Sequence, residues 1–140
     1  MIFGRYEVKN EEESKLLARK IALHLRSNDI LAFKGDLGAG KSFLCRQIIK
    51  NLCGEHVTVV SPTYNLLQIY ETRDSRTIYH FDLYRLKNSA EIYELGIEDA
   101  LADNICLIEW PEIIEFMLPK NIIYINIQIL DHAGRIITII

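Results

Sequence analysis

One short segment, GDLGAGKS at residues 35–42, restricts what this chain can fold into more than any other part of its sequence. It matches the pattern G-x-x-x-x-G-K-[ST], in which backbone N–H groups of a glycine-rich loop surround a polyphosphate. The apolar run ILAF at 30–33 precedes the segment, and an amphipathic stretch at 41–52 follows it. A buried parallel strand, a loop and a helix in this order indicate a phosphate-binding loop, or P-loop. The sequence therefore predicts a nucleoside triphosphate site.

The positions of this loop have distinct expected roles. Its glycines let the backbone approach the phosphates closely and adopt unusual dihedral angles. We expect the Lys41 ammonium to neutralise charge on the β- and γ-phosphates and the Ser42 hydroxyl to ligate Mg²⁺. The residues expected to contact the nucleotide in this segment are Asp36, Leu37, Gly38, Ala39, Gly40, Lys41 and Ser42.

A P-loop enzyme also needs an acidic group near the metal, and two carboxylates are candidates. Glu109 directly follows the apolar run ICLI at 105–108, and Asp82 lies in the segment HFDLYRL at 80–86. Ligands bind at the carboxyl ends of parallel strands, which favours Glu109 as a metal ligand beside Ser42. Each carboxylate is also compatible with a solvated or ion-paired position on its strand.

The base and the phosphate acceptor are less constrained. No Asn-Lys-x-Asp segment, the usual guanine-binding pattern, occurs in the chain, which favours adenine. Arg85 fits either an arginine finger or a surface ion pair. Trp110, the only tryptophan, fits either a core position or a functional surface.

Hydrophobic periodicity and turn residues predict an α/β fold. Strands are expected at 2–8, at 30–33 and at 105–108, and two hairpins at 66–84 and 122–140. The run of β-branched residues at 57–60 is expected to form a further strand. Helices are expected after the capping boxes Asn10–Glu13 and Asn88–Glu91, the first ending near 27–28, and at 41–52 before Gly54. We predict a three-layer, P-loop NTPase-like domain with a mixed, mostly parallel sheet.

Composition favours one folded domain over residues 1–140. The chain is 49% hydrophobic and 25% charged, so it holds enough apolar material for a core. Its net charge of -3 argues against a broad basic surface that binds nucleic acid alone. No apolar run approaches the ~20 residues of a membrane span, and none resembles a signal peptide, so a cytoplasmic location without membrane contact is expected. Cys45, Cys53 and Cys106 lack a CxxC spacing and are expected to be buried apolar side chains.

Five segments occur in a fixed order along the chain. They are GDLGAGKS at 35–42, SPTY at 61–64, HFDLYRL at 80–86, ELGIED at 94–99 and ICLIEW at 105–110. Together they closely resemble the bacterial TsaE (YjeE) family over residues 10–135. The resemblance implies an ATPase component of the machinery that makes N6-threonylcarbamoyladenosine in tRNA. It also implies ATP and Mg²⁺ as cofactors, slow hydrolysis and a TsaB–TsaD-type partner complex that brings tRNA in indirectly.

The resemblance also assigns roles to single residues. Lys41 and Ser42 fall on the Walker A lysine and hydroxyl residue of the family, which usually has threonine at the second position. Glu109 falls on its metal-associated glutamate, and Asp82 on an aspartate that is a candidate for ordering the metal or the attacking water. The segment 61–64 falls on a switch-like segment. Residues that the resemblance places on the adenine side are Asn10, Glu11, Gly134 and Arg135.

The resulting hypothesis is an ATPase with Lys41, Asp82 and Glu109 as catalytic residues and Mg²⁺ held by Ser42 and Glu109. Hydrolysis would change the segments 61–64 and 80–85 and, through them, the contact with a partner. Two alternatives stay open. One is a small-molecule or nucleoside kinase, although no arginine-rich lid is evident. The other is a scaffold that binds the nucleotide without hydrolysing it.

Overall fold

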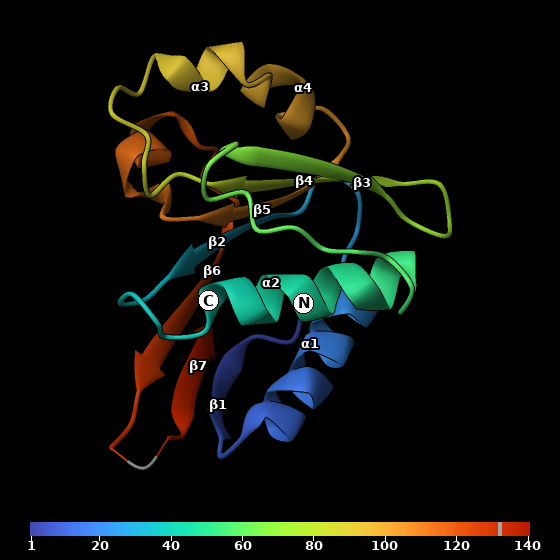
Figure 1. Ribbon diagram of the computed structural model, residues 1–140, viewed down its shortest axis with the longest axis vertical. Helices are drawn as coiled ribbons and strands as arrows, with labels where there is room; N and C mark the ends of the chain where they lie inside the picture. The colour runs from blue at the N-terminus through green and yellow to red at the C-terminus, as the bar shows by residue number, and fades with distance from the viewer. Residues whose placement is uncertain (132) are drawn as a thin grey trace.

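The computed structural model describes residues 1–131 and 133–140, which form a seven-stranded sheet between two layers of helices (Figure 1). This arrangement confirms the three-layer α/β fold with a mixed, mostly parallel sheet. The elements follow one another as β1 (Gly4–Val8), α1 (Glu11–His24), β2 (Ile30–Lys34), α2 (Lys41–Cys53), β3 (Leu67–Glu71), β4 (Thr77–Asp82), α3 (Glu91–Glu94), α4 (Ile97–Leu101), β5 (Ile105–Glu109), the 3-10 helix η1 (Pro111–Met117), β6 (Ile123–Ile129) and β7 (Arg135–Ile139).

The strands are ordered β1-β7-β6-β2-β5-β4-β3 across the sheet. The four neighbours β6, β2, β5 and β4 run parallel, and the antiparallel pairs lie toward the two edges. All five residues of β5 are buried, as expected of a strand with both faces covered. The central position of β2 therefore brings the loop after it next to the ends of β5 and β4.

Each face of the sheet is covered by its own group of helices. On one face α1 and α2 pack on the sheet through the buried side chains Leu17, Ile21, Leu44 and Ile48. On the opposite face α3, α4 and η1 cover a second core that includes Phe81, Ile92, Ile97, Ile108 and Ile114 (Figure 1). Cys45 and Cys106 are buried as expected, and Cys53 is partly buried. No helix within the described residues combines the length and the apolar content that crossing a membrane requires.

Local signals place the starts of both long helices correctly. The Asn10 side chain accepts a hydrogen bond from the Glu13 backbone N–H at 2.9 Å, which caps α1. A capping box would pair the Glu13 carboxylate with the Asn10 backbone N–H. The carboxylate instead accepts from the Lys9 backbone N–H at 2.7 Å, one residue earlier. Helix α1 ends at His24, before the expected 27–28, because Leu25 already adopts an extended conformation.

Two expectations about the middle of the chain are wrong. The run 57–60 forms no strand, because the Tyr70 hydroxyl bonds the Val60 backbone N–H at 3.2 Å and its carbonyl oxygen at 3.3 Å. A side chain of β3 therefore takes the place of a strand partner. The helix expected from Asn88 through Leu95 is shorter, because Asn88 bonds the Ala90 N–H within a turn and α3 spans only Glu91–Glu94. Gly96, with φ +83°, then separates α3 from α4.

Both predicted hairpins are confirmed, as β3–β4 and as β6–β7. The predicted edge strand at 2–8 is also confirmed as β1, which pairs with β7 from Gly4↔Ile139 to Val8↔Arg135. Of the turn expected between β6 and β7, His132 lies outside the described residues. The pairing of β1 with β7 brings Asn10 and Glu11 at the start of α1 into one cavity wall with the P-loop.

Candidate nucleotide-binding site

The topology of the sheet brings the candidate residues together. The P-loop joins the carboxyl end of β2 to α2, whose cap residue Gly40 has φ +111°. This left-handed conformation explains why a glycine precedes the lysine. Glu109 ends β5 and is paired in register with Phe33 of β2 on one side and with Asp82 of β4 on the other. Both carboxylates therefore lie at the strand ends where α/β sheets bind ligands.

Lys41 is held at the centre of the loop. Its side chain is 5% exposed, and its Nζ donates hydrogen bonds to the Gly35 carbonyl and, at 3.0 Å, to the Asp36 carbonyl. The Trp110 ring covers the ammonium, with its centroid 4.0 Å from Nζ. Burial lowers the pKa of Lys41, and the negative charges led by Glu109 oppose this shift. An anion that replaces these contacts would meet a desolvated ammonium.

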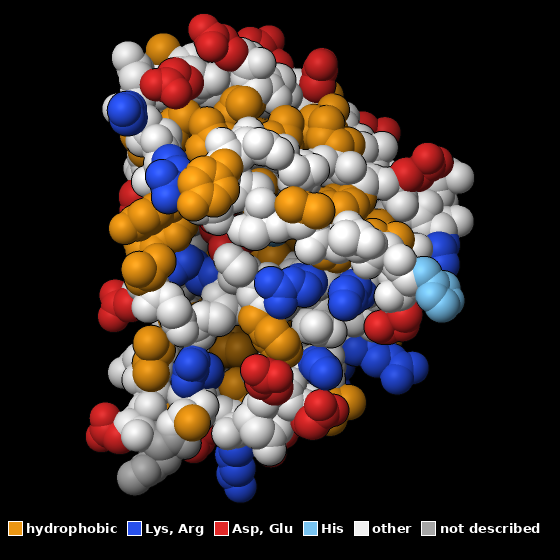
Figure 2. All heavy atoms as spheres, in the orientation of Figure 1, with side chains coloured by type: hydrophobic (Ala, Val, Ile, Leu, Met, Phe, Trp, Pro, Cys, Tyr) orange, Lys and Arg blue, Asp and Glu red, His pale blue; other side chains and the backbone are white. Residues whose placement is uncertain are grey.

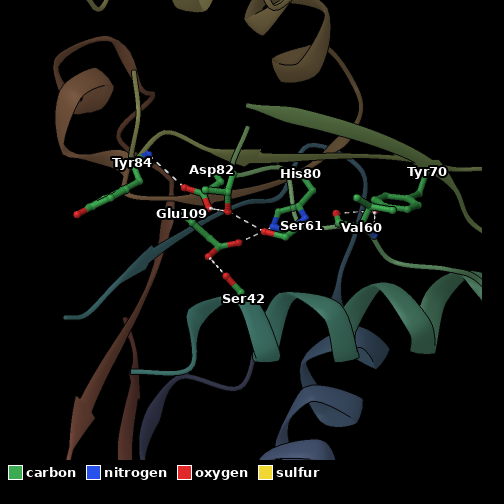
Figure 3. A network of polar contacts seen from close by, with 9 residues as sticks. Ser42, Val60, Ser61, Tyr70, His80, Asp82, Tyr84 and Glu109 are labelled. Carbon is green, nitrogen blue, oxygen red and sulfur yellow. Dashed lines mark hydrogen bonds and ion pairs between the residues drawn. The ribbon is translucent and has the colours of Figure 1, made fainter. Parts of the chain in front are cut away.

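Behind the loop, a buried hydrogen-bonded chain joins α2, β5 and β4. The Ser42 hydroxyl donates to Glu109 Oε1 at 2.7 Å, and His80 Nε2 lies 2.7 Å from Glu109 Oε2 (Figure 3). Glu109 is 1% exposed and His80 2% exposed. A P-loop hydroxyl paired with a carboxylate at the end of the neighbouring strand is the arrangement in which P-loop proteins hold Mg²⁺.

Asp82 lies beside Glu109 but has its own partners. Its Oδ1 accepts from the Tyr84 backbone N–H and its Oδ2 from the Thr63 hydroxyl, both at 3.1 Å (Figure 3). Thr63 in turn shares a hydrogen bond of 2.8 Å with Ser61. Burial raises the pKa of Asp82, and the nearby Glu109 charge raises it further. The segment 61–64 is thus tied directly to a carboxylate of the site.

Two cavities lie on the two sides of the P-loop and share Gly38, Gly40 and Phe43 in their walls. The first, of about 240 Å³, is lined among others by Lys41, Ser42, Asp82, Glu109, Leu37, Thr63, Tyr84 and Trp110. We call it the metal-side cavity. It contains every residue that the sequence predicted to be catalytic or to bind the metal.

The second cavity, of about 260 Å³, is the base-side cavity. Asn10, Glu11 and Arg135 line it together with Ala39 of the P-loop. The Arg135 Nε donates to the Ala39 carbonyl at 2.8 Å, so β7 is joined to the loop directly. Gly134 is not among the lining residues. It packs against β1 so closely that a Cβ there would lie 3.2 Å from the Val8 carbonyl oxygen.

The residues present fit a magnesium nucleotide. A hydroxyl and a carboxylate are oxygen ligands of the kind that Mg²⁺ prefers. Hypothetical Cβ atoms at Gly38 and Gly40 would meet nothing within 4 Å, so the backbone at both positions faces open space. The N-terminus of the 13-residue helix α2 contributes unpaired N–H groups and the positive end of its dipole. Asp36 contributes its carbonyl to Lys41 and is not among the lining residues of either cavity.

Arg85 and Trp110 have different surroundings. The Arg85 guanidinium lies 4.5 Å from the centroid of the Tyr64 ring, outside the residues that line the two cavities. Trp110 packs on the second core and also lines the metal-side cavity. The centroid of its ring lies 4.9 Å from the centroid of the Tyr84 ring. Its φ of +56° is uncommon for a bulky residue and aims the ring back over Lys41.

Sequence reasoning missed the lining residues Phe43 and Tyr84, and it also missed His80, which contacts Glu109 behind the metal-side cavity. The signal was present in the segment at 80–86, because residues two apart on a strand share a face. His80 and Asp82 therefore had to point to the same side of β4, toward Glu109.

A larger surface depression lies elsewhere, between α1 and α2, and measures about 730 Å³. Its lining includes Lys15, Arg19 and Lys50 together with Glu12 and Glu55. In Figure 2, Lys, Arg, Asp and Glu side chains lie close together on this face of the molecule. Charges of both signs indicate a solvated helical surface, so we assign the site to the P-loop.

Comparisons with known proteins identify the family of the chain. The sequence model of the family "Threonylcarbamoyl adenosine biosynthesis protein TsaE" matches residues 8–137. The chain is 55% identical over 131 residues to the tRNA threonylcarbamoyladenosine biosynthesis protein TsaE of Rickettsia felis, covering 94% of this chain and 76% of that protein. The corresponding protein of Rickettsia bellii is 52% identical over 139 residues, or 99% and 96% of the two chains. The crystal structure of Bacillus subtilis YdiB is similar with a TM-score of 0.78 and 28% identity, covering 97% of this chain and 83% of that one.

Proposed function

Because this chain belongs to the TsaE family of tRNA threonylcarbamoyladenosine biosynthesis proteins, we propose that it is the ATPase component of that pathway. In this proposal the chain binds ATP with Mg²⁺ and hydrolyses the nucleotide slowly. The observation that supports it best is the contact between Ser42 and Glu109 at 2.7 Å, beside the buried Lys41. A P-loop hydroxyl, a strand-end carboxylate and a desolvated lysine are the parts that phosphoryl transfer requires.

Each polar side chain of the metal-side cavity has its own proposed role. Lys41 leaves the Gly35 and Asp36 carbonyls and binds the β- and γ-phosphates, where its charge stabilises the transition state. Ser42 and Glu109 hold Mg²⁺, which when bound neutralises phosphate charge. Asp82 orients the attacking water or the metal shell. The backbone N–H groups of residues 36–42 bind the phosphate oxygens. Asn10, Glu11 and Arg135 form the adenine side, and Gly134 allows β7 to pack closely on β1 beside it.

The segment 61–64 is the proposed link from nucleotide to partner. Thr63 bonds Asp82 inside the site, whereas the neighbouring Tyr64 is 80% exposed and lies under Arg85. A change at Asp82 on hydrolysis would therefore move an exposed aromatic residue. The proposed partner is a TsaB–TsaD-type complex in the cytoplasm, which brings tRNA to the reaction.

The test compares ATP hydrolysis by the purified chain with and without a TsaB–TsaD pair. We expect slow hydrolysis alone and a changed rate with the pair. Multiple turnover of the tRNA modification should stop with Lys41→Ala. Undiminished turnover together with lost ATP binding would contradict coupling. Strong stimulation by one metabolite, with none by the protein pair, would favour the kinase. Tight ATP binding without phosphate release, even with the pair present, would favour the scaffold.

A further inference from the structure

His80 is a buried polar residue to which the proposed function gives no role. It lies on β4 two residues before Asp82 and is 2% exposed. It is not among the described residues that line the metal-side cavity. Its only side-chain partner in the described part of the chain is Glu109, at 2.7 Å. An effect of His80 on the site therefore has to pass through its contact with Glu109, because His80 does not reach the nucleotide cavity.

The partners of Glu109 determine which nitrogen of His80 carries a proton. An ionised carboxylate only accepts hydrogen bonds, so Ser42 must donate to Oε1 and His80 Nε2–H to Oε2. A second N–H at Nδ1 would have no acceptor to bind. This agrees with a second observation, since Nδ1 is buried and has no hydrogen-bond partner among residues 1–131 and 133–140. Nothing described within reach of Nδ1 competes for the proton.

The two contacts together fix the plane of the carboxylate. Glu109 ends a strand, and the χ angles of an unsupported carboxylate there would be free to rotate. His80 sits inside β4, which is paired on both sides by β3 and β5, so its ring has a fixed backbone. With Oε2 bound to His80, Oε1 stays directed at Ser42 and the metal-side cavity.

We propose that His80 is a positioning residue, whose Nε2–H holds the Glu109 carboxylate in the orientation that Mg²⁺ binding with Ser42 requires. This inference rests on the proposed Mg-nucleotide function. Hydrogen-bonded neighbours of metal-binding groups typically change metal affinity or activity by 10- to 100-fold when removed. His80 thus affects the metal requirement without touching the nucleotide.

The test uses two substitutions at His80 and a matched control. His80→Leu removes the donor, and His80→Gln places an amide N–H near the position of Nε2. Cys45→Ala is the control, because Cys45 is buried and has its sulfur within 4.8 Å of the ligand atoms of His80 and Glu109, yet it takes no part in the hydrogen-bonded chain. It thus reports the effect of disturbing the packing alone.

We expect His80→Leu to raise the half-saturating Mg²⁺ concentration for hydrolysis by about 10-fold or more, and to weaken Mn²⁺ binding to the nucleotide complex, measured by electron paramagnetic resonance, to the same degree. Nucleotide affinity measured in a chelator should not change. His80→Gln should restore most of the metal affinity, and Cys45→Ala should resemble the unmodified chain. An unchanged metal requirement in His80→Leu, or an equal loss in Cys45→Ala, would overturn the proposal.

A measurement on the unmodified chain keeps the proposal testable if a variant does not fold. Nitrogen-15 NMR of the His80 ring should show a protonated Nε2 and a bare Nδ1 near neutral pH, with the Nε2 signal shifting when Mg²⁺ and nucleotide are added. A proton on Nδ1 alone would overturn the inference. If the unmodified chain neither binds nor hydrolyses Mg-ATP, the proposed function fails, while the ring tautomer still decides the contact with Glu109.

Discussion

The two sides of the P-loop are built differently. On the metal side, Ser42, Asp82 and Glu109 come from one helix and two adjacent strands, and their carboxylates are 4% and 1% exposed. On the base side, Asn10 and Glu11 are exposed at the start of α1, and Arg135 is the residue joined to the loop by a hydrogen bond. Buried polar contacts hold the metal side in place, whereas the base side forms an exposed rim at the surface.

This difference separates two kinds of effect. Buried groups with several partners each are held in one geometry, so a change there should alter the rate of the chemical step. Residues at an exposed rim bind the nucleotide about equally in the ground state and the transition state, so a change there should alter affinity alone. The following substitutions test the contrast in order of expected effect.

The largest effect is expected for Lys41→Ala. It removes the only ammonium in the metal-side cavity described here, and we expect hydrolysis to fall by on the order of 100- to 1,000-fold. The rate of phosphate release measures the loss of hydrolysis, and calorimetry measures nucleotide binding. Lys120→Ala, an exposed lysine in a turn, is the matched control. A fall of only a few-fold would remove the distinction between the two sides.

Asp82→Asn should separate activity from stability. We expect hydrolysis to fall by about 100-fold, as for loss of a group that orients a reacting water. Because folding raises the pKa of Asp82 above its usual 3.8, the folded chain holds this proton more tightly than the unfolded chain does. Its charge therefore lowers stability progressively as pH rises from the unfolded value through the folded one.

The variant lacks this charge, so without nucleotide and metal it should melt at a higher temperature than the unmodified chain at pH 7. The difference should shrink as pH falls toward 4. Thermal unfolding at a series of pH values measures it. A variant that melts lower at every pH would show that the contacts with Thr63 and Tyr84 outweigh the burial of the charge.

Arg135→Ala tests the base side. Loss of its hydrogen bond to Ala39 should weaken ATP binding by about tenfold, or ~1.4 kcal/mol, with the rate at saturating ATP unchanged. Fluorescence of Trp110, the only tryptophan and a neighbour of Lys41, provides the binding signal. Arg5→Ala, on the exposed part of β1, is the control. A reduced saturating rate would mean that both sides act on the chemical step.

The smallest effect is expected for Asn10→Ala. Loss of the helix cap at α1 should lower the free energy of unfolding by ~1 kcal/mol, measured by denaturant titration. Nucleotide affinity should change less than in Arg135→Ala. Asn121→Ala, at an exposed position before β6, should leave stability unchanged. A loss of affinity larger than that of Arg135→Ala would identify Asn10 as the main base-side contact.

Much of the fold and of the metal side could be predicted because local rules decide them. Gly40 is needed for a left-handed turn, Ser42 follows from the loop pattern, and Glu109 follows from the end of a buried strand. The β2–α2 unit and both hairpins follow from periodicity and turn residues in the same way. These features depend on neighbours within a few residues, or on a sheet rule with one outcome.

The rest depends on partners that are distant in sequence. The run 57–60 has the composition of a strand, but the Tyr70 hydroxyl bonds the polar groups of Val60. Such a contact between a side chain and a distant backbone leaves no local pattern. His80 could have been placed on the correct face of β4, whereas its contact with Glu109 required the order of β4 and β5. The same holds for Trp110, whose ring reaches Lys41 through an unusual φ.

The pairing of β1 with β7 has a consequence for synthesis on the ribosome. The P-loop and both carboxylates of the metal side have been translated once β5 is made. Val8 and its sheet partner Arg135 both line the base-side cavity. This wall therefore cannot form until β7 has been translated and pairs with β1. Contacts between such distant segments form late and slowly. A nascent chain can thus contain all the residues of the proposed catalytic apparatus before it contains all those proposed to hold the base.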